Sequence, residues 1–139
     1  MINEEEVIIE KLKKVHNIES MIEFNNLNIQ DELQKNPYYI MKYKELYIRE
    51  KSILDHIEDK YDKVVGERYH FYRFESDENM TKTEIEKYCL PKDEKIIKLK
   101  KIMRKQKIRV EFFDACYKAF EKRQWSMKTF SENLRYGGI

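Results

Sequence analysis

Apolar residues recur at alternating steps of three and four between residues 92 and 120, which is the spacing of a coiled-coil-like seam on an α-helix. A second apolar seam runs along another face of the same helix. Because a helix that is apolar on two faces needs neighbours on two sides, the pattern predicts a long helix whose second half is buried. The first seam comprises Ile96, Leu99, Met103, Gln106, Val110, Phe113, Tyr117 and Phe120, of which only Gln106 is not apolar, and the second comprises Ile108, Phe112, Ala115 and Ala119.

Heptad spacing predicts another long helix upstream, from residue 37 to about residue 74. Asn36 followed by Pro37 is typical of a helix start, because the first helical position has an N–H without a partner and proline has none to lose. Gly66 is the weak point of this helix and predicts a kink or the close approach of another backbone. Its apolar positions are Ile40, Tyr43, Tyr47, Leu54, Ile57, Tyr61 and Val64.

Shorter helices are expected on either side. Asn3 followed by three glutamates predicts the start of a first helix, and residues 17–36 are expected to form a short helix or an irregular connector. Thr81 with Glu84 forms a capping-box pattern that predicts a short helix to about Leu90. The helix that begins near residue 92 is expected to end near residues 122–124, and a last short amphipathic helix follows it.

No stretch gives a convincing strand, so the elements predict an all-α protein with two long helices plus short helices. At 139 residues the chain fits one helical domain. Within residues 1–139 we expect an N-terminal helix and connector (1–36), a long helix (37–74), a turn and short helix (75–91), and C-terminal oligomerisation helices (92–139).

Charge is distributed unevenly along the chain. Residues 1–50 hold seven basic and ten acidic residues, residues 51–91 the same numbers, and residues 92–139 fourteen and six. No acidic residue interrupts the basic run from Lys95 to Arg109. A basic block of this kind favours nucleic acid or another polyanion as a partner, while a solvated face or a match for an acidic protein are the alternatives.

The segment from Arg68 to Phe74 interleaves aromatic rings with cations. Such a segment suits single-stranded nucleic acid, because bases stack on the rings while arginines contact phosphates. The alternative is a helix end whose aromatic side chains pack on the core.

Motifs for catalysis or metal binding are not found. His16, His56 and His70 have no metal-ligand spacing, and three glycines form no phosphate-binding loop. Cys89 and Cys116 form no CxxC pair and are read as reduced thiols of an intracellular protein. No signal peptide and no membrane-spanning run is expected, so we predict a cytoplasmic binding or assembly protein without catalytic residues, metal or cofactor.

Three stretches resemble the UvsY family of phage recombination mediators. The first is Pro37 with Lys42 and Tyr43, and the second runs from Lys82 through Asp93 to Lys98. The third and most specific runs from Val110 to Cys116 and on through Lys122-Arg123-Gln-Trp-Ser-Met-Lys128. The likeness covers about Pro37 to Tyr136.

The resemblance implies a non-enzymatic protein of phage recombination that acts in the host cell cytoplasm. It implies that the chain binds single-stranded DNA, contacts a single-strand-binding protein and a RecA-like recombinase, and helps the recombinase replace the former. It also implies a closed ring-like homo-oligomer, a hexamer or heptamer, held by the C-terminal region. The alternative is an oligomeric helical adaptor or phage structural protein that does not bind DNA.

Residues of two kinds are candidates for these roles. The resemblance implies a DNA contact near Arg68, with Lys60, Lys63 and Arg73 around it because Gly66 stands where the family has a basic residue. The remaining DNA candidates follow from the aromatic segment and the basic run: Tyr69, Phe71, Tyr72, Lys98, Lys101, Arg104, Lys105 and Arg109. The oligomerisation candidates are Val110, Phe112, Phe113, Tyr117, Phe120, Trp125, Met127 and Phe130. A monomer whose apolar seams are covered by its own N-terminal residues would contradict this assembly.

Overall fold

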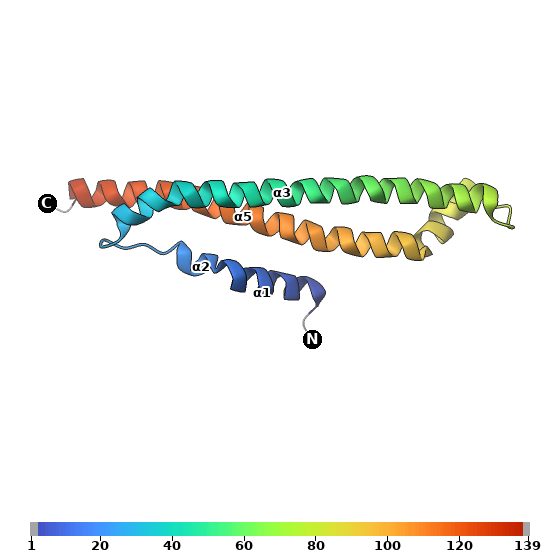
Figure 1. The fold of residues 1–139 in the computed structure, drawn as a ribbon, viewed down its shortest axis with the longest axis horizontal. Coiled ribbons are helices and arrows are strands. Elements are labelled where there is room, and N and C mark those ends of the chain that lie inside the picture. Colours follow the sequence, from blue (N-terminus) through green and yellow to red (C-terminus); the bar gives the residue numbers. More distant parts are fainter. Residues whose placement is uncertain (1–2, 138–139) are drawn as a thin grey trace. The chain divides into compact units, whose positions relative to one another are not determined.

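The computed structural model describes residues 3–137. Every regular element among them is helical, which confirms the all-α prediction, and two helices are far longer than the others (Figure 1). In chain order the elements are α1 (Glu4–His16), α2 (Ile18–Met21), α3 (Ile29–His70), the π-helix η1 (Phe71–Glu75), α4 (Lys82–Glu84), the π-helix η2 (Ile85–Cys89), the 3₁₀-helix η3 (Leu90–Lys92) and α5 (Glu94–Gly137).

Two predicted helix starts are confirmed. The Asn3 side chain accepts a hydrogen bond from the Glu6 amide at 2.8 Å, and the Glu6 carboxylate accepts one from the Asn3 amide at 3.4 Å. The Thr81 hydroxyl accepts a hydrogen bond from the Glu84 amide at 3.3 Å. Both contacts satisfy amides that the first turn of a helix leaves without a partner.

The predicted start of the long upstream helix is wrong, because α3 begins seven residues before Asn36, at Ile29. Asn25 and Asn28 form the turn that precedes it: the Asn28 side chain accepts from the Asn25 amide at 2.7 Å. Asn36 does not cap a helix end but is buried inside α3, where its side chain bonds to α5. Pro37 therefore lies in the helix interior.

The structure contradicts the close backbone approach at Gly66 and the expected end of the second long helix. Nothing lies within 4 Å of the position that a Cβ on Gly66 would occupy, so no backbone approaches α3 closely there. The predicted end near residues 122–124 is also wrong, since α5 continues to Gly137 and includes the expected last helix. No proline or glycine stands between residues 94 and 136 to stop it.

The described residues pack into two compact units. The first comprises residues 3–50 and 108–137, and the second comprises residues 51–107. That residues 1–139 form a single helical domain stays a prediction.

The core of the first unit joins α1, α3 and α5. Leu12, Tyr43, Phe113, Cys116 and Phe120 form its buried cluster, and Ile8, Ile18 and Met21 pack against it from α1 and α2. Residues of both α5 seams therefore find neighbours within the chain, one in α3 and the other in the N-terminal helices. The two-sided burial predicted for α5 is satisfied inside a single chain.

His16 is part of this core rather than a ligand. Its ring lies edge-on to Phe113, with 5.1 Å between centroids, and its Nδ1 is 3.1 Å from the Tyr43 hydroxyl. Burial, together with the positive charges of Lys42 and Arg109, lowers the pKa of His16 below its usual 6.5. Burial likewise raises the pKa of Tyr43 to about 12. Both groups are therefore neutral near pH 7.

A buried polar cluster fixes the connection between α2 and α3. The Arg123 guanidinium donates to the Glu32 carboxylate at 2.7 Å, to Asn36 Oδ1 at 3.1 Å, and to the backbone carbonyls of Ile22 and Glu23. The Asn36 amide in turn donates to the Phe120 carbonyl at 2.8 Å. Arg123 is only 4% exposed, so these bonds replace the water that it loses.

The second unit has a smaller core. Leu54, Ile85 and Ile96 are its buried apolar residues, and Asp93 and Gln106 are buried polar ones. Asp93 begins α5, since its Oδ1 accepts from the amides of Lys95 and Ile96. This cap sets where the basic run of α5 starts.

Candidate nucleic-acid interface

The basic face of α5 is the set of exposed cations between Lys95 and Lys107. In this stretch Ile96 and Gln106 point inward and are buried, while every lysine and arginine is exposed. Among residues 3–137 no carboxylate pairs with Lys98, Lys101 or Arg104. The members of the basic face are Lys95, Lys98, Lys100, Lys101, Arg104, Lys105 and Lys107.

Part of the basic face borders a shallow hollow of about 350 Å³. Lys95, Lys98 and Lys101 line it together with Glu94 and with Ile97, which is partly exposed. The three cations can contact phosphates and Ile97 can contact a base or sugar, whereas the Glu94 carboxylate repels a phosphate placed next to it.

Arg109, by contrast, has a partner within the chain. Its guanidinium lies 3.3 and 3.4 Å from the two carboxylate oxygens of Glu50, so it makes a two-point contact between α5 and α3. A phosphate would have to compete with Glu50 for this arginine. Arg109 is therefore a weaker candidate than the cations of the basic face.

Arg68 and Tyr72 are also engaged inside the chain. Both donate to Oδ2 of Asp93, each at 2.7 Å, and the Arg68 guanidinium lies over the Phe71 ring at 4.4 Å. Burial alone would raise the pKa of Asp93, but the hydrogen bonds from Tyr72, Arg68 and the Ile96 amide outweigh burial and lower it. The Asp93 carboxylate thus stays charged and ties the end of α3 to the start of α5.

The other candidates near Arg68 differ in exposure and in whether they bond to the rest of the chain. Arg73 donates to the Met80 carbonyl at 2.9 Å, and Tyr69 is half-buried. Lys60 and Lys63 are exposed on α3. Phe74, which was not singled out as a stacking residue, is 70% exposed and is the most accessible ring of the segment. Its position at the end of the aromatic run is the feature of the sequence that could have identified it.

The oligomerisation candidates divide by burial. Val110, Phe113, Phe120 and Met127 are buried within their own chain, so in this structure their side chains are closed to a second copy. Three others are half-buried and only one is exposed. The half-buried residues are Phe112, Tyr117 and Phe130, and the exposed residue is Trp125. That these residues join copies of the chain stays a prediction.

No group of three or more metal-ligating side chains comes together in residues 3–137. Within the same range no helix combines the length and apolar character needed to cross a membrane.

Comparisons with known proteins agree on one family. Residues 16–137 match the family model described as "Recombination, repair and ssDNA binding protein UvsY". The crystal structure of the bacteriophage T4 recombination mediator protein UvsY is similar to this chain, with a TM-score of 0.75 and 15% sequence identity. The match covers 92% of this chain and 97% of that chain. A search of curated protein sequences gave no match.

Proposed function

The chain belongs to the UvsY family of recombination, repair and single-stranded-DNA-binding proteins, and we propose that it is a recombination mediator. In this proposal it binds single-stranded DNA that carries a single-strand-binding protein and helps a RecA-like recombinase to replace that protein. It acts in the host cell cytoplasm, by binding and assembly, without catalysis or a cofactor.

The basic face of α5 is the observation that carries the DNA-binding half of the proposal. Its cations are exposed, and Lys98, Lys101 and Arg104 have no carboxylate partner in residues 3–137. Cations in this state bind phosphates with release of counterions, which gives an affinity that falls steeply with salt. The hollow beside Ile97 adds an apolar contact that a flexible strand can reach.

Self-association strengthens this grip. One basic face offers few phosphate contacts and binds weakly, whereas tethered copies act at a high effective concentration. We therefore propose a ring-like homo-oligomer of six or seven subunits, which presents one basic face per subunit along the same strand. Of the apolar candidates, Trp125 has the most surface left for a second copy.

Fluorescence anisotropy with a labelled single-stranded oligonucleotide tests DNA binding. A variant with Lys98→Ala, Lys101→Ala and Arg104→Ala should bind more weakly, and the slope of log K against log salt should fall by about 2, since each lost contact to a single strand removes about 0.7. The matched control removes three exposed lysines of the first unit, at Lys11, Lys14 and Lys44. Equal effects of the two variants would show that only net charge matters.

The adaptor or structural alternative is favoured by one observation, that Arg68 and Tyr72 are held by Asp93 and not free to meet a strand. It predicts equal binding to single strands, duplex DNA and heparin. A mediator should prefer the single strand. The same anisotropy assay, run with unlabelled duplex and heparin as competitors, separates the two functions.

A further inference from the structure

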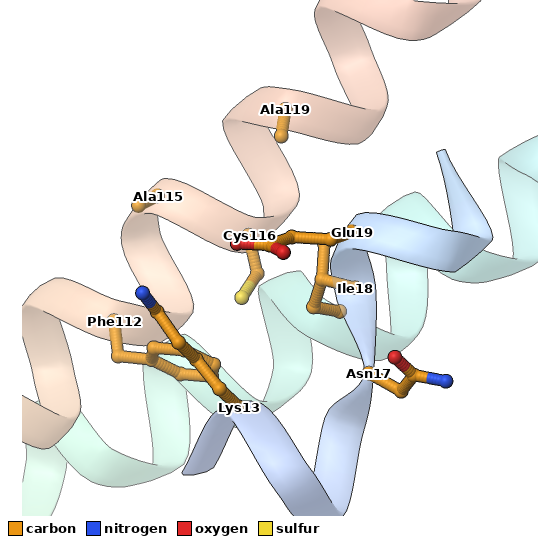
Figure 2. A pocket seen from close by; sticks show the side chains of 8 residues that line it. All are labelled: Lys13, Asn17, Ile18, Glu19, Phe112, Ala115, Cys116 and Ala119. Carbon is orange, nitrogen blue, oxygen red and sulfur yellow. The ribbon is translucent and has the colours of Figure 1, made fainter. Parts of the chain in front are cut away.

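A cavity of about 270 Å³ lies between the N-terminal helices and α5 in the first unit. Phe112, Cys116 and Ile18 give it apolar walls, and the side chains of Lys13 and Glu19 extend from α1 and α2 toward α5 (Figure 2). Its other lining residues are Asn17, Ala115 and Ala119.

The cavity follows from the local sequence. Ala115 and Ala119 continue the second apolar seam of α5, but their methyl groups are too short to fill the space opposite them. The N-terminal chain changes direction there, because Asn17 adopts a left-handed conformation with φ 47° between α1 and α2. Two small residues that face a break between helices leave the space open.

Trp125 is the opposite case, a large side chain without a cavity to fill. It is the one tryptophan of the chain and is 70% exposed, although it stands on the same helix as the fully buried Phe120 and Met127. Tryptophan is enriched among the residues that anchor protein interfaces, because it buries a large apolar area with few rotatable bonds. An exposed tryptophan next to a well-filled core is therefore a candidate anchor for binding another molecule.

Size and charge match between these two features. An apolar cavity of roughly 150 Å³ takes up benzene, so about 270 Å³ is room enough for an indole ring. Lys13 and Glu19 place one charge of each sign at the cavity. Exposed residues of both signs also flank Trp125, at Glu121, Lys122 and Lys128. Opposite charges can therefore meet around an inserted ring.

We infer that Trp125 of one copy inserts into the cavity between α1, α2 and α5 of the next copy. At about 100° per residue, Trp125 points roughly 110° away from the direction shared by Phe112, Ala115 and Ala119. Donor and acceptor are thus different surfaces of one chain, which makes the contact heterologous, and a heterologous contact builds a ring when its rotation closes. The inference rests on the self-association proposed above and names the contact that produces it.

Complementary variants test the contact directly. Trp125→Ala removes the knob and leaves the cavity, while Ala119→Leu fills the cavity and leaves the knob. Each variant alone should lose the parental mass in light scattering and fall to a monomer. Mixed in equal amounts they should form a dimer, because the cavity of the first accepts the tryptophan of the second.

Tryptophan fluorescence shows whether the ring enters the cavity in the mixture. Since Trp125→Ala has no tryptophan, all tryptophan emission in the mixture comes from Ala119→Leu, and it should shift to the blue as the ring leaves water. Adding the double variant, which lacks both tryptophan and cavity, should leave the emission unchanged. Tyr136→Ala is the matched control for removing an aromatic ring, because Tyr136 is also 70% exposed on α5, and it should keep the parental mass.

The possible results distinguish the proposed assembly from the proposed contact. A parental chain that stays monomeric at all concentrations overturns both the proposed assembly and this contact. An assembled parental chain whose tryptophan emits as in water, or single variants that keep the parental mass, overturns the contact and leaves the assembly standing. Folded single variants, verified by circular dichroism, that fail to pair in the mixture also overturn it.

Discussion

Replacing Arg123 by alanine should be among the most destabilising single changes outside the apolar core. The substitution removes four hydrogen bonds that the guanidinium makes to Glu32, Asn36 and two backbone carbonyls. It leaves Asn36, which is fully buried, without a donor for its Oδ1. The Glu32 carboxylate, whose side chain is only 18% exposed, keeps only its longer contact with Lys35, at 3.9 Å.

The magnitude follows from these partners. Removing one member of a buried ion pair costs about 3–5 kcal/mol, chiefly through the charge left behind. Because Glu32 keeps some contact with water, the lower end applies, and we expect a loss of about 3 kcal/mol in the free energy of unfolding. For a chain of this size that loss lowers the melting temperature by roughly 6–12 °C. Arg123→Lys should fall between, since an ammonium cannot reproduce the fork of the guanidinium.

Urea unfolding followed by circular dichroism measures this loss, with all variants at one protein concentration because self-association adds to apparent stability. Limited proteolysis supplies a local measurement: the segment from Ile22 to Asn28 should be cut sooner, since two of its carbonyls lose their donor. Arg135→Ala is the control, an exposed arginine on the same helix that should change stability by no more than about 0.5 kcal/mol. If Arg123→Ala and Arg135→Ala unfold alike, the polar cluster does not hold this connection.

Three further changes test other parts of the structure. The pKa of the Asp93 carboxyl lies below its ordinary 3.8 in the folded chain. The charged carboxylate therefore stabilises the fold above pH 3.8, and this stabilisation is lost as the pH falls through the folded pKa. On acidification the urea midpoint should drop more in the parental chain than in Asp93→Asn. Burial raises the pKa of Cys116 to about 12, so a thiol reagent near neutral pH should modify only Cys89 in the folded protein and both cysteines in urea, and rapid modification of Cys116 in the folded state would contradict its burial. Gly66→Ala should raise the free energy of unfolding by about 0.5–1 kcal/mol, because the site is helical and open, and a loss measured in the same urea assay would reveal a neighbour that the structure does not show.

The sequence predicted helix content and apolar faces better than helix ends. The seams of α5 were legible because helical periodicity is local, and the Asn3 and Thr81 caps because each closes within three residues. The Asn36–Pro37 pair misled because it is typical of a helix start, whereas here Asn36 is buried in α3 and its side chain bonds to α5. Its outcome depended on the Phe120 carbonyl, 84 residues away, which no local pattern reveals.

Charged site residues were the hardest to place from sequence. Arg68, Arg109 and Arg123 look alike in a basic chain, yet in the structure they pair with Asp93, Glu50 and Glu32. Each partner lies on a distant segment, so spacing carries no signal for it. Lys98, Lys101 and Arg104 stood out correctly as exposed cations because a run without acidic residues leaves no local partner.

The apolar seams of α5 show where a single sequence stops being informative about assembly. Two-sided burial was required, but periodicity cannot say whether the second neighbour belongs to the same chain or to another. In this structure α1 and α2 are the second neighbour, and Phe113 and Phe120 are buried in the chain's own core. In the proposed assembly the contact with a second copy centres on Trp125 instead. In a closed ring every subunit would make this contact twice, as knob and as pocket, so each copy would be held more firmly than by the single contact of a dimer.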